Sequence, residues 1–374
     1  MPRLDPYDAV LLLSFGGPER PEDVVPFLEN VTRGRGVPAE RLREVATHYD
    51  AVGGRSPIND QNRALVAALR GELANRGYDV PVGWGNRNWA PYCVDALRDL
   101  ADAGARRVVV VTTSAYSSYS SCRQYRENLA DAVIALAAEG RAVAVDRVRA
   151  YYDHPGFADA VTQATLAAVE ALPDGLRDDA RLVFVTHSIP VAMDESSGPD
   201  GQAYAAQHAE LAGVVGERVA ASTGQDRRPE LTYCSRSGPP GQPWLEPDVN
   251  DHLRRLAAEG VRAVVLVPIG FVSDHMEVVH DLDAEAADTA RRLGLELRRA
   301  ATVGTHPDFV AGLVDVIEER AERARGGQPR EPVVGTLGPW PSVCVAGCCP
   351  NARAVRPAAC GADWTAPLVA EAVR

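Results

Sequence analysis

The amino-acid sequence predicts an α/β protein with two Rossmann-like domains, each a parallel sheet flanked by helices. Three observations support this prediction. Short apolar runs of strand length recur along the chain, longer amphipathic segments of helical length separate them, and 374 residues are enough for two such units. Ligands of open parallel sheets bind beyond the carboxyl ends of the strands, so the residues that follow each apolar run are candidates for a functional site.

Four apolar runs are predicted to be buried parallel strands: 9–13, 108–112, 182–186 and 263–268. Helices are expected between them, where apolar residues recur with helical spacing: 62–76, 125–138, 201–219 and 249–259. The pattern restarts at Tyr151-Tyr-Asp-His-Pro, so we expect a domain boundary near residue 150. From residue 326 the composition changes to Gly, Pro, Arg and Cys, which predicts a separate tail over 326–374.

Composition restricts the class of function. The formal net charge of -12 argues against nucleic acid as a general partner. No apolar run approaches the roughly 18 residues that span a bilayer, so we expect a soluble, cytoplasmic protein without stable membrane insertion. All 39 basic residues are arginine, which excludes a lysine Schiff base and a Walker-type phosphate loop.

The most informative segment is 270–286, which follows an apolar run and is rich in acids and histidines. Glu277, Asp281 and Glu285 are four residues apart, so a helix there would place all three carboxylates on one face. Stacked acids repel each other, and a purely structural helix has little reason to align them. The spacing therefore favours a path for cations or protons.

His187 directly follows the apolar run 182–186 and is a candidate base or metal ligand, because imidazole titrates near neutrality. An ordinary strand-end histidine is the alternative, but Glu277 is predicted at the same sheet edge, and the two are expected to face one crevice. Asp274 is either a helix N-cap or a support for the site. His275 is offset from Glu277 and is expected to point elsewhere.

Seven cysteines are present, and four of them crowd into the tail: Cys344, Cys348, Cys349 and Cys360. Disulfides are not expected in a cytoplasmic protein, so we interpret the tail cysteines, together with Cys122, as ligands of a soft metal. Zinc and an iron–sulfur cluster both accept four thiolates, and a redox or incidental role is the alternative.

Two polar loops lie near the expected ligand edge. Arg33 and Arg35 form a small basic loop, which is either simply solvated or an anchor for carboxylates or phosphates. The segment 53–58, Gly-Gly-Arg-Ser-Pro-Ile, is either a turn or a place where a flat ligand approaches the backbone closely.

Taken together, these motifs resemble the ferrochelatase family over about residues 7–323. Six blocks occur in that family's order: Leu11-Leu-Leu-Ser-Phe-Gly-Gly-Pro, Arg33-Gly-Arg, Gly53-Gly-Arg-Ser-Pro-Ile, Thr186-His-Ser-Ile-Pro, Pro243-Trp-Leu-Glu-Pro-Asp and Gly270-Phe-Val-Ser-Asp-His-Met-Glu. The resemblance implies two chelatase-type domains facing across a porphyrin cleft, and insertion of Fe²⁺ into a porphyrin. It also implies that the helix over 302–325 returns to the first domain (1–150), while 151–301 forms the second.

The resemblance also assigns residues. His187 is similar to the family's active-site histidine and Glu277 to the carboxylate that faces it; both would contact the Fe²⁺ substrate. Asp281 and Glu285 resemble an acidic line leading away. The expected porphyrin contacts are Phe15, Arg33, Ser56 and Tyr125. Phe15 stands where many relatives carry tyrosine, so no phenolic ligand is expected there.

Some ferrochelatases hold a [2Fe–2S] cluster with one mid-chain cysteine and three near the C-terminus. Cys122, Cys344, Cys348 and Cys349 are similar to these ligands, although their spacing differs from the animal pattern C-x2-C-x4-C. Cys360 is the alternative to Cys122 or to one of the adjacent pair.

For the mechanism, we expect a largely neutral His187 to accept pyrrole protons while Glu277 guides iron or protons. Coproporphyrin III, with four propionates, is preferred over protoporphyrin IX, because the N-terminal region is polar and the chain resembles the family's Gram-positive and actinobacterial branch. The product would be coproheme, in haem biosynthesis. A cobalt or sirohydrochlorin chelatase and a non-catalytic haem or cluster sensor are the competing hypotheses. A monomer with transient contacts to haem-pathway enzymes is expected.

Overall fold

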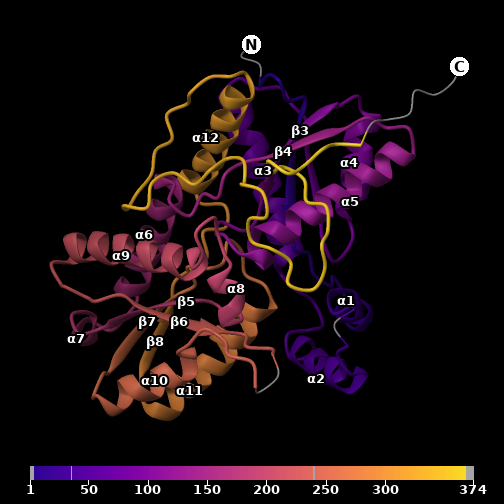
Figure 1. Cartoon of the computed structure of the whole chain (residues 1–374). Helices are drawn as coiled ribbons and strands as arrows, with labels where there is room; N and C mark the ends of the chain where they lie inside the picture. Colours follow the sequence, from indigo (N-terminus) through magenta and orange to yellow (C-terminus); the bar gives the residue numbers. More distant parts are fainter. Residues whose placement is uncertain (1–3, 35, 239–240, 368–374) are drawn as a thin grey trace, which may run out of the picture.

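The structure is a computed structural model that describes residues 4–34, 36–238 and 241–367 (Figure 1). It contains two four-stranded sheets in which every neighbouring pair is parallel. The strand orders are β2-β1-β3-β4 and β6-β5-β7-β8. The first sheet comprises β1 (Ala9–Ser14), β2 (Val82–Asn86), β3 (Arg107–Thr112) and β4 (Ala144–Arg147). The second comprises β5 (Arg181–His187), β6 (Glu230–Cys234), β7 (Ala263–Val267) and β8 (Glu296–Arg299). The predicted fold class is confirmed.

Helices cover both faces of each sheet because the central strands are apolar on both sides. In β1, Val10 and Leu12 face one cluster and Leu11 and Leu13 face the opposite one. The helices that complete these layers are α3 (Ile58–Asn75), α4 (Cys93–Asp102), α5 (Gln124–Ala138), α6 (Pro155–Glu170), α9 (Ala203–Thr223), α10 (Val249–Ala258), α11 (Ala287–Leu293) and α12 (Pro307–Ala324).

A single apolar cluster connects the two halves of the molecule, the first half built on the sheet β2-β1-β3-β4 and the second on the sheet β6-β5-β7-β8. It contains residues of both sheets, such as Val109 of β3 and Phe184 of β5, together with Phe157 of α6 and Phe309 of α12. The helix α12 packs against α6 and also against α3. The two sheets are therefore held by one continuous core, and their carboxyl edges keep a fixed relation.

Short elements follow the carboxyl ends of strands: the 3₁₀ turn η1 (Pro21–Asp23), α1 (Val24–Val31), α2 (Ala39–Asp50), η2 (Tyr119–Arg123), α8 (Val191–Glu195) and η3 (Val278–Ala286). The short helix α7 (Asp174–Arg177) instead precedes β5, at the opposite edge of the second sheet. Both η2 and η3 are π-helical, a geometry that is frequent at functional sites. Phe27 and Tyr49 pack α1 and α2 together, and Met276 of the second half joins their apolar cluster.

The tail after α12 crosses back over the first half and runs along α5 (Figure 1). Its backbone is tied there by hydrogen bonds, including one from the amide of Ala359 to the carbonyl of Arg126. Within the described residues, no helix combines the length and the apolar character that a membrane span needs.

Candidate functional site

His187 and Glu277 meet at the carboxyl edge of the second sheet. His187 is the last residue of β5, and Glu277 precedes η3 in the segment that leaves the neighbouring strand β7. Their Nε2 and Oε1 atoms are 3.5 Å apart. The other ring nitrogen of His187, Nδ1, is hydrogen-bonded to the carbonyl of Ser188, which fixes the ring. The structure thus brings together two residues that lie 90 positions apart in the chain.

The charges of this pair differ from the expectation. Burial favours the neutral imidazole, but the Glu277 carboxylate outweighs burial and raises the pKa of His187 to about 9. Burial also disfavours the charged carboxylate, yet His187 lowers the pKa of Glu277 to about 2. This raised pKa contradicts the prediction of a largely neutral His187. At neutral pH the two side chains form an ion pair.

His275 belongs to the same group, contrary to the expectation that it points elsewhere. Its Nδ1 accepts a hydrogen bond from the amide of Glu277 at 3.2 Å and lies 3.5 Å from Oε2 of that carboxylate. The reason is local, since His275 lies in the turn before η3 and does not follow helical spacing. Asp274 accepts hydrogen bonds from Arg299 and Thr302, each at 3.2 Å, and so anchors this turn to the end of β8 and the segment that follows it.

The acidic line continues along η3. Asp281 accepts a hydrogen bond from Ser235, and burial raises the pKa of Asp281 to about 6. His280 lies 3.4 Å from Glu285, and one ligand atom from each of His280, Asp281 and Glu285 falls within 4.8 Å of the others. Glu285 is exposed. The line therefore leads from the half-buried His187–Glu277 pair to the surface, in a π-helix.

The helix α2 reaches this line from the first half. The ring of His48 stacks on His280 with centroids 3.8 Å apart. Burial, and then the charge of Glu277, raise the pKa of Tyr49. Together with the packing of Met276, these contacts place α1 and α2 beside the acidic residues.

An arginine missed in the sequence connects two expected porphyrin contacts. The guanidinium of Arg87 lies 5.6 Å from the ring centroid of Phe15 and 4.6 Å from that of Tyr125. Its Nε donates to Asn128 at 2.8 Å. Arg87 follows β2, which lacks a long apolar run, so no strand end was predicted beside it. It presents a positive charge at the carboxyl edge of the first sheet.

The two other expected porphyrin contacts, Ser56 and Arg33, are not among the residues that Arg87 connects. Ser56 is buried, and its amide donates to the carbonyl of Pro18 at 3.0 Å. Arg33 is exposed after α1. Arg35 lies outside the described residues.

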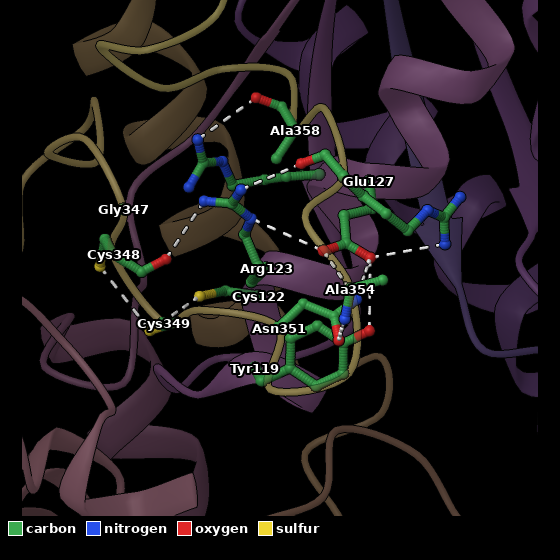
Figure 2. Close-up of polar contacts among 12 residues, drawn as sticks. Tyr119, Cys122, Arg123, Glu127, Gly347, Cys348, Cys349, Asn351, Ala354 and Ala358 are labelled. Carbon is green, nitrogen blue, oxygen red and sulfur yellow. Dashed lines mark hydrogen bonds and ion pairs between the residues drawn. The ribbon is translucent and has the colours of Figure 1, made fainter. Parts of the chain in front are cut away.

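Four cysteines converge on a second site. Cys122 of η2 and the tail residues Cys344, Cys348 and Cys349 form one buried group. The Sγ atom of Cys349 is 3.8 Å from that of Cys122 and 3.7 Å from that of Cys348 (Figure 2). Cys360 is not part of this group, because its thiol donates to the carbonyl of Val145 at 3.4 Å within the core of the first sheet.

Buried charges fix the tail around the cysteines. Figure 2 shows Arg123 between Glu127 and the tail: its Nε is 3.7 Å from Glu127, and its Nη1 donates to the carbonyl of Cys348 at 3.5 Å. Glu127 is fully buried and also accepts hydrogen bonds from Tyr119 and Asn351. On the other side, the amide of Gly198 donates to Cys349 Sγ at 3.1 Å. The site therefore touches both halves of the protein.

The family profile described as Ferrochelatase matches residues 7–321. The chain belongs to the ferrochelatase family. It is 56% identical over 364 residues to the coproporphyrin III ferrochelatase of Streptomyces coelicolor, covering 96% of this chain and 97% of that protein. It is 50% identical over 375 residues to the coproporphyrin III ferrochelatase of Leifsonia xyli, covering 95% and 94%.

A solved structure supports the fold of this ferrochelatase. SirB from Bacillus subtilis with Fe3+ superposes with a TM-score of 0.50 at 12% sequence identity, covering 85% of this chain and 98% of that one. At this identity the likeness concerns the fold alone. It agrees with the predicted arrangement of two Rossmann-like domains.

Proposed function

We propose that this ferrochelatase inserts Fe²⁺ into coproporphyrin III to give coproheme. The observation that carries the proposal is the His187–Glu277 pair, 3.5 Å apart at the edge of a parallel sheet. An imidazole and a carboxylate can bind Fe²⁺ and also exchange protons, which are the two requirements of porphyrin metallation. The curated relatives named coproporphyrin III ferrochelatase support the choice of porphyrin.

Metallation requires iron to approach the pyrrole nitrogens while two N–H protons leave. The raised pKa of His187 favours its protonated form, and that form cannot accept a pyrrole proton. A ferrous ion that arrives at Glu277 compensates the carboxylate charge that holds the proton on His187. The pKa of the imidazole then falls, its proton passes to solvent along the acidic residues of η3, and neutral His187 accepts a proton from the porphyrin. The second pyrrole proton leaves through His187 by the same route. Iron arrival thus prepares the base.

The acidic line gives ions and protons a route. Asp281, with a pKa raised to about 6, exchanges protons readily near neutrality. Glu285 and His280 extend this route to the exposed end of η3. Because the ligand atoms of these three side chains lie close together, the same route suits a divalent cation that moves toward Glu277.

The four propionates of coproporphyrin III need positive partners on a strongly acidic protein. We assign this role to Arg87, held between Phe15 and Tyr125, and to Arg33 in the exposed loop after α1. A guanidinium binds a carboxylate with two parallel hydrogen bonds. Ser56, buried beside Gly17, contributes through the shape of the loop that precedes α3.

The cysteine site fits a [2Fe–2S] cluster held by Cys122, Cys344, Cys348 and Cys349. Their sulfur atoms are buried together, and buried arginines surround them. Such a cluster, when bound, is a one-electron acceptor held by four thiolates. Cys360 is left out of the ligand set because it contacts Val145 instead.

We also propose the domain division 1–150 with 302–325, 151–301 and 326–374. The boundary near residue 150 is supported because β4 and β5 belong to different sheets. The assignment of 302–325 to the first domain is supported by the packing of α12 on α3. Cytoplasmic location and a monomeric state stay predictions.

Iron insertion measured under anaerobic conditions with purified protein tests the function. We expect kcat/KM with coproporphyrin III to exceed that with protoporphyrin IX by about tenfold, a difference of about 1.4 kcal/mol in transition-state stabilisation. Equal efficiency with the two porphyrins would contradict the substrate assignment, and no insertion with either would contradict the function.

A further inference from the structure

Arg147 faces the cysteine site, and its nearest polar contact there is a sulfur atom. It is the last residue of β4 and is fully buried. Its Nη2 donates to the Sγ of Cys344 at 3.8 Å. In the part of the chain that the structure describes, no ion pair joins Arg147 to a carboxylate. A guanidinium stays charged in proteins, so a buried arginine needs a negative partner nearby.

Arg149, two residues further along, shows the ordinary solution. It is equally buried, but its Nε lies 2.8 Å from Glu319 and its Nη1 binds Asp153 at 2.5 Å. The two arginines thus differ in their partners: Arg149 binds carboxylates, whereas Arg147 binds a sulfur atom. A neutral thiol does not compensate a guanidinium, whereas a thiolate does.

Arg126 approaches the same site from α5. It is fully buried, and its Nε donates to the carbonyl of Ala359 at 2.7 Å. Its Nη1 has no hydrogen-bond partner among the described residues, and its nearest carboxylate, that of Asp363, is 3.5 Å away and partly exposed. Both Arg126 and Arg147 act electrostatically on Cys122, Cys344 and Cys348.

We propose that Arg147, assisted by Arg126, is the counter-charge of the four-thiolate site and sets how readily a cluster bound there accepts an electron. The inference rests on the cluster assigned above. Four thiolates and an oxidised two-iron core have a net charge of two negative units, which two guanidiniums balance. One added electron makes the site more negative, and the guanidiniums stabilise that state. Arg147 acts on the cluster through its positive charge and does not bind the iron.

The test uses the full-length protein, with dithionite as the electron donor and redox dyes as the reference. In Arg147→Met, the ratio of reduced to oxidised cluster at a fixed potential should fall about tenfold, a shift of about 59 mV to more negative potential for a one-electron couple. Arg147→Lys keeps the charge and should restore most of the difference. An unchanged potential in Arg147→Met overturns the inference.

Arg356→Gln is the matched control. Arg356 lies in the same tail, but its ion-pair partners are Glu127 and Asp131. The substitution removes a positive charge that does not face the sulfur atoms, and the potential should stay at the wild-type value. A shift as large as that of Arg147→Met would show that any lost charge has this effect, which also overturns the inference.

A second measurement covers variants that do not retain the cluster. Stripping the cluster with a chelator should lower the Tm of the wild-type protein strongly, because Arg147 then loses its partner. The loss on stripping should be smaller in Arg147→Met, and an equal loss counts against the proposal. Cluster loss from both Arg147→Met and Arg147→Lys, with both proteins folded, indicates a role of shape and also overturns it. Wild-type protein without bound iron and sulfide would contradict the proposed cluster itself, which is a separate result.

Discussion

At His187, one carboxylate decides the protonation state of the whole site. The sequence identifies both partners, because a histidine and an acidic line follow neighbouring apolar runs. It does not give the state of His187, since a pKa depends on a 3.5 Å contact that spacing cannot supply. The same holds for His275, whose role depends on a turn before η3. Arg87 is found only in the fold, because it follows an edge strand with a weak pattern.

Replacing Glu277 with Gln should return the pKa of His187 from about 9 toward its ordinary value of about 6.5. The raised pKa also determines how the stability of the protein depends on pH. In the wild type, the contribution of His187 to stability is present below about pH 6.5 and is lost as the pH rises through 9. NMR titration of the His187 ring measures its pKa in the wild type and in Glu277→Gln. A pKa that stays near 9 in Glu277→Gln would refute the ion pair.

Replacing Arg87 with Met should weaken binding of coproporphyrin III by about tenfold or more, since a hydrogen bond to a charged group contributes about 1.5–3 kcal/mol. The tetramethyl ester of the same porphyrin should bind both proteins equally, because it lacks carboxylates. Fluorescence titration measures the affinities. Arg63→Met is the control, because Arg63 also lies over an aromatic ring, that of Trp84. Equal weakening for acid and ester would contradict a propionate contact.

At the scale of elements, the four strands predicted from the sequence are β1, β3, β5 and β7, which are the central strands of the two sheets. The strands missed are β2, β4, β6 and β8, and all four are edge strands. The reason is burial: central strands are covered on both faces and read as apolar runs, whereas β8 has the sequence Glu-Leu-Arg-Arg. The π-helical form of η3 was not predicted either, because an acid at every fourth position suits both helix types.

The tail depends on one close approach at Gly361. A Cβ atom there would lie 1.8 Å from Nη2 of Arg126. Gly361→Ala should therefore lower the free energy of unfolding by about 1–3 kcal/mol and reduce the iron and sulfide content. Gly71→Ala, in the open interior of α3, should instead stabilise the protein by about 0.5–1 kcal/mol. Denaturant unfolding and metal analysis measure both variants, and a neutral Gly361→Ala would contradict the docked tail.

The whole molecule places its two chemical sites at different junctions. The His187–Glu277 pair faces α1 and α2, which reach η3 through the stacked rings of His48 and His280. The cysteine site lies where the tail meets α5 and the loop of Gly198. One apolar cluster runs through both sheets, so the sites keep a fixed relation. Sequence patterns predict each half, but contacts between residues so distant in the chain come only from the fold.

In the proposed mechanism His187 accepts pyrrole protons during iron insertion. Anaerobic insertion of Fe²⁺ into coproporphyrin III by His187→Ala, compared with the wild type, measures this role. His306→Asn serves as the control, because His306 caps α12 away from this site. We expect kcat to fall by about 10²–10⁴-fold in His187→Ala, because the proton acceptor is lost, while its affinity for the porphyrin is unchanged. The kcat of His306→Asn should stay near the wild-type value. Insertion by His187→Ala at the wild-type rate would contradict this role of His187.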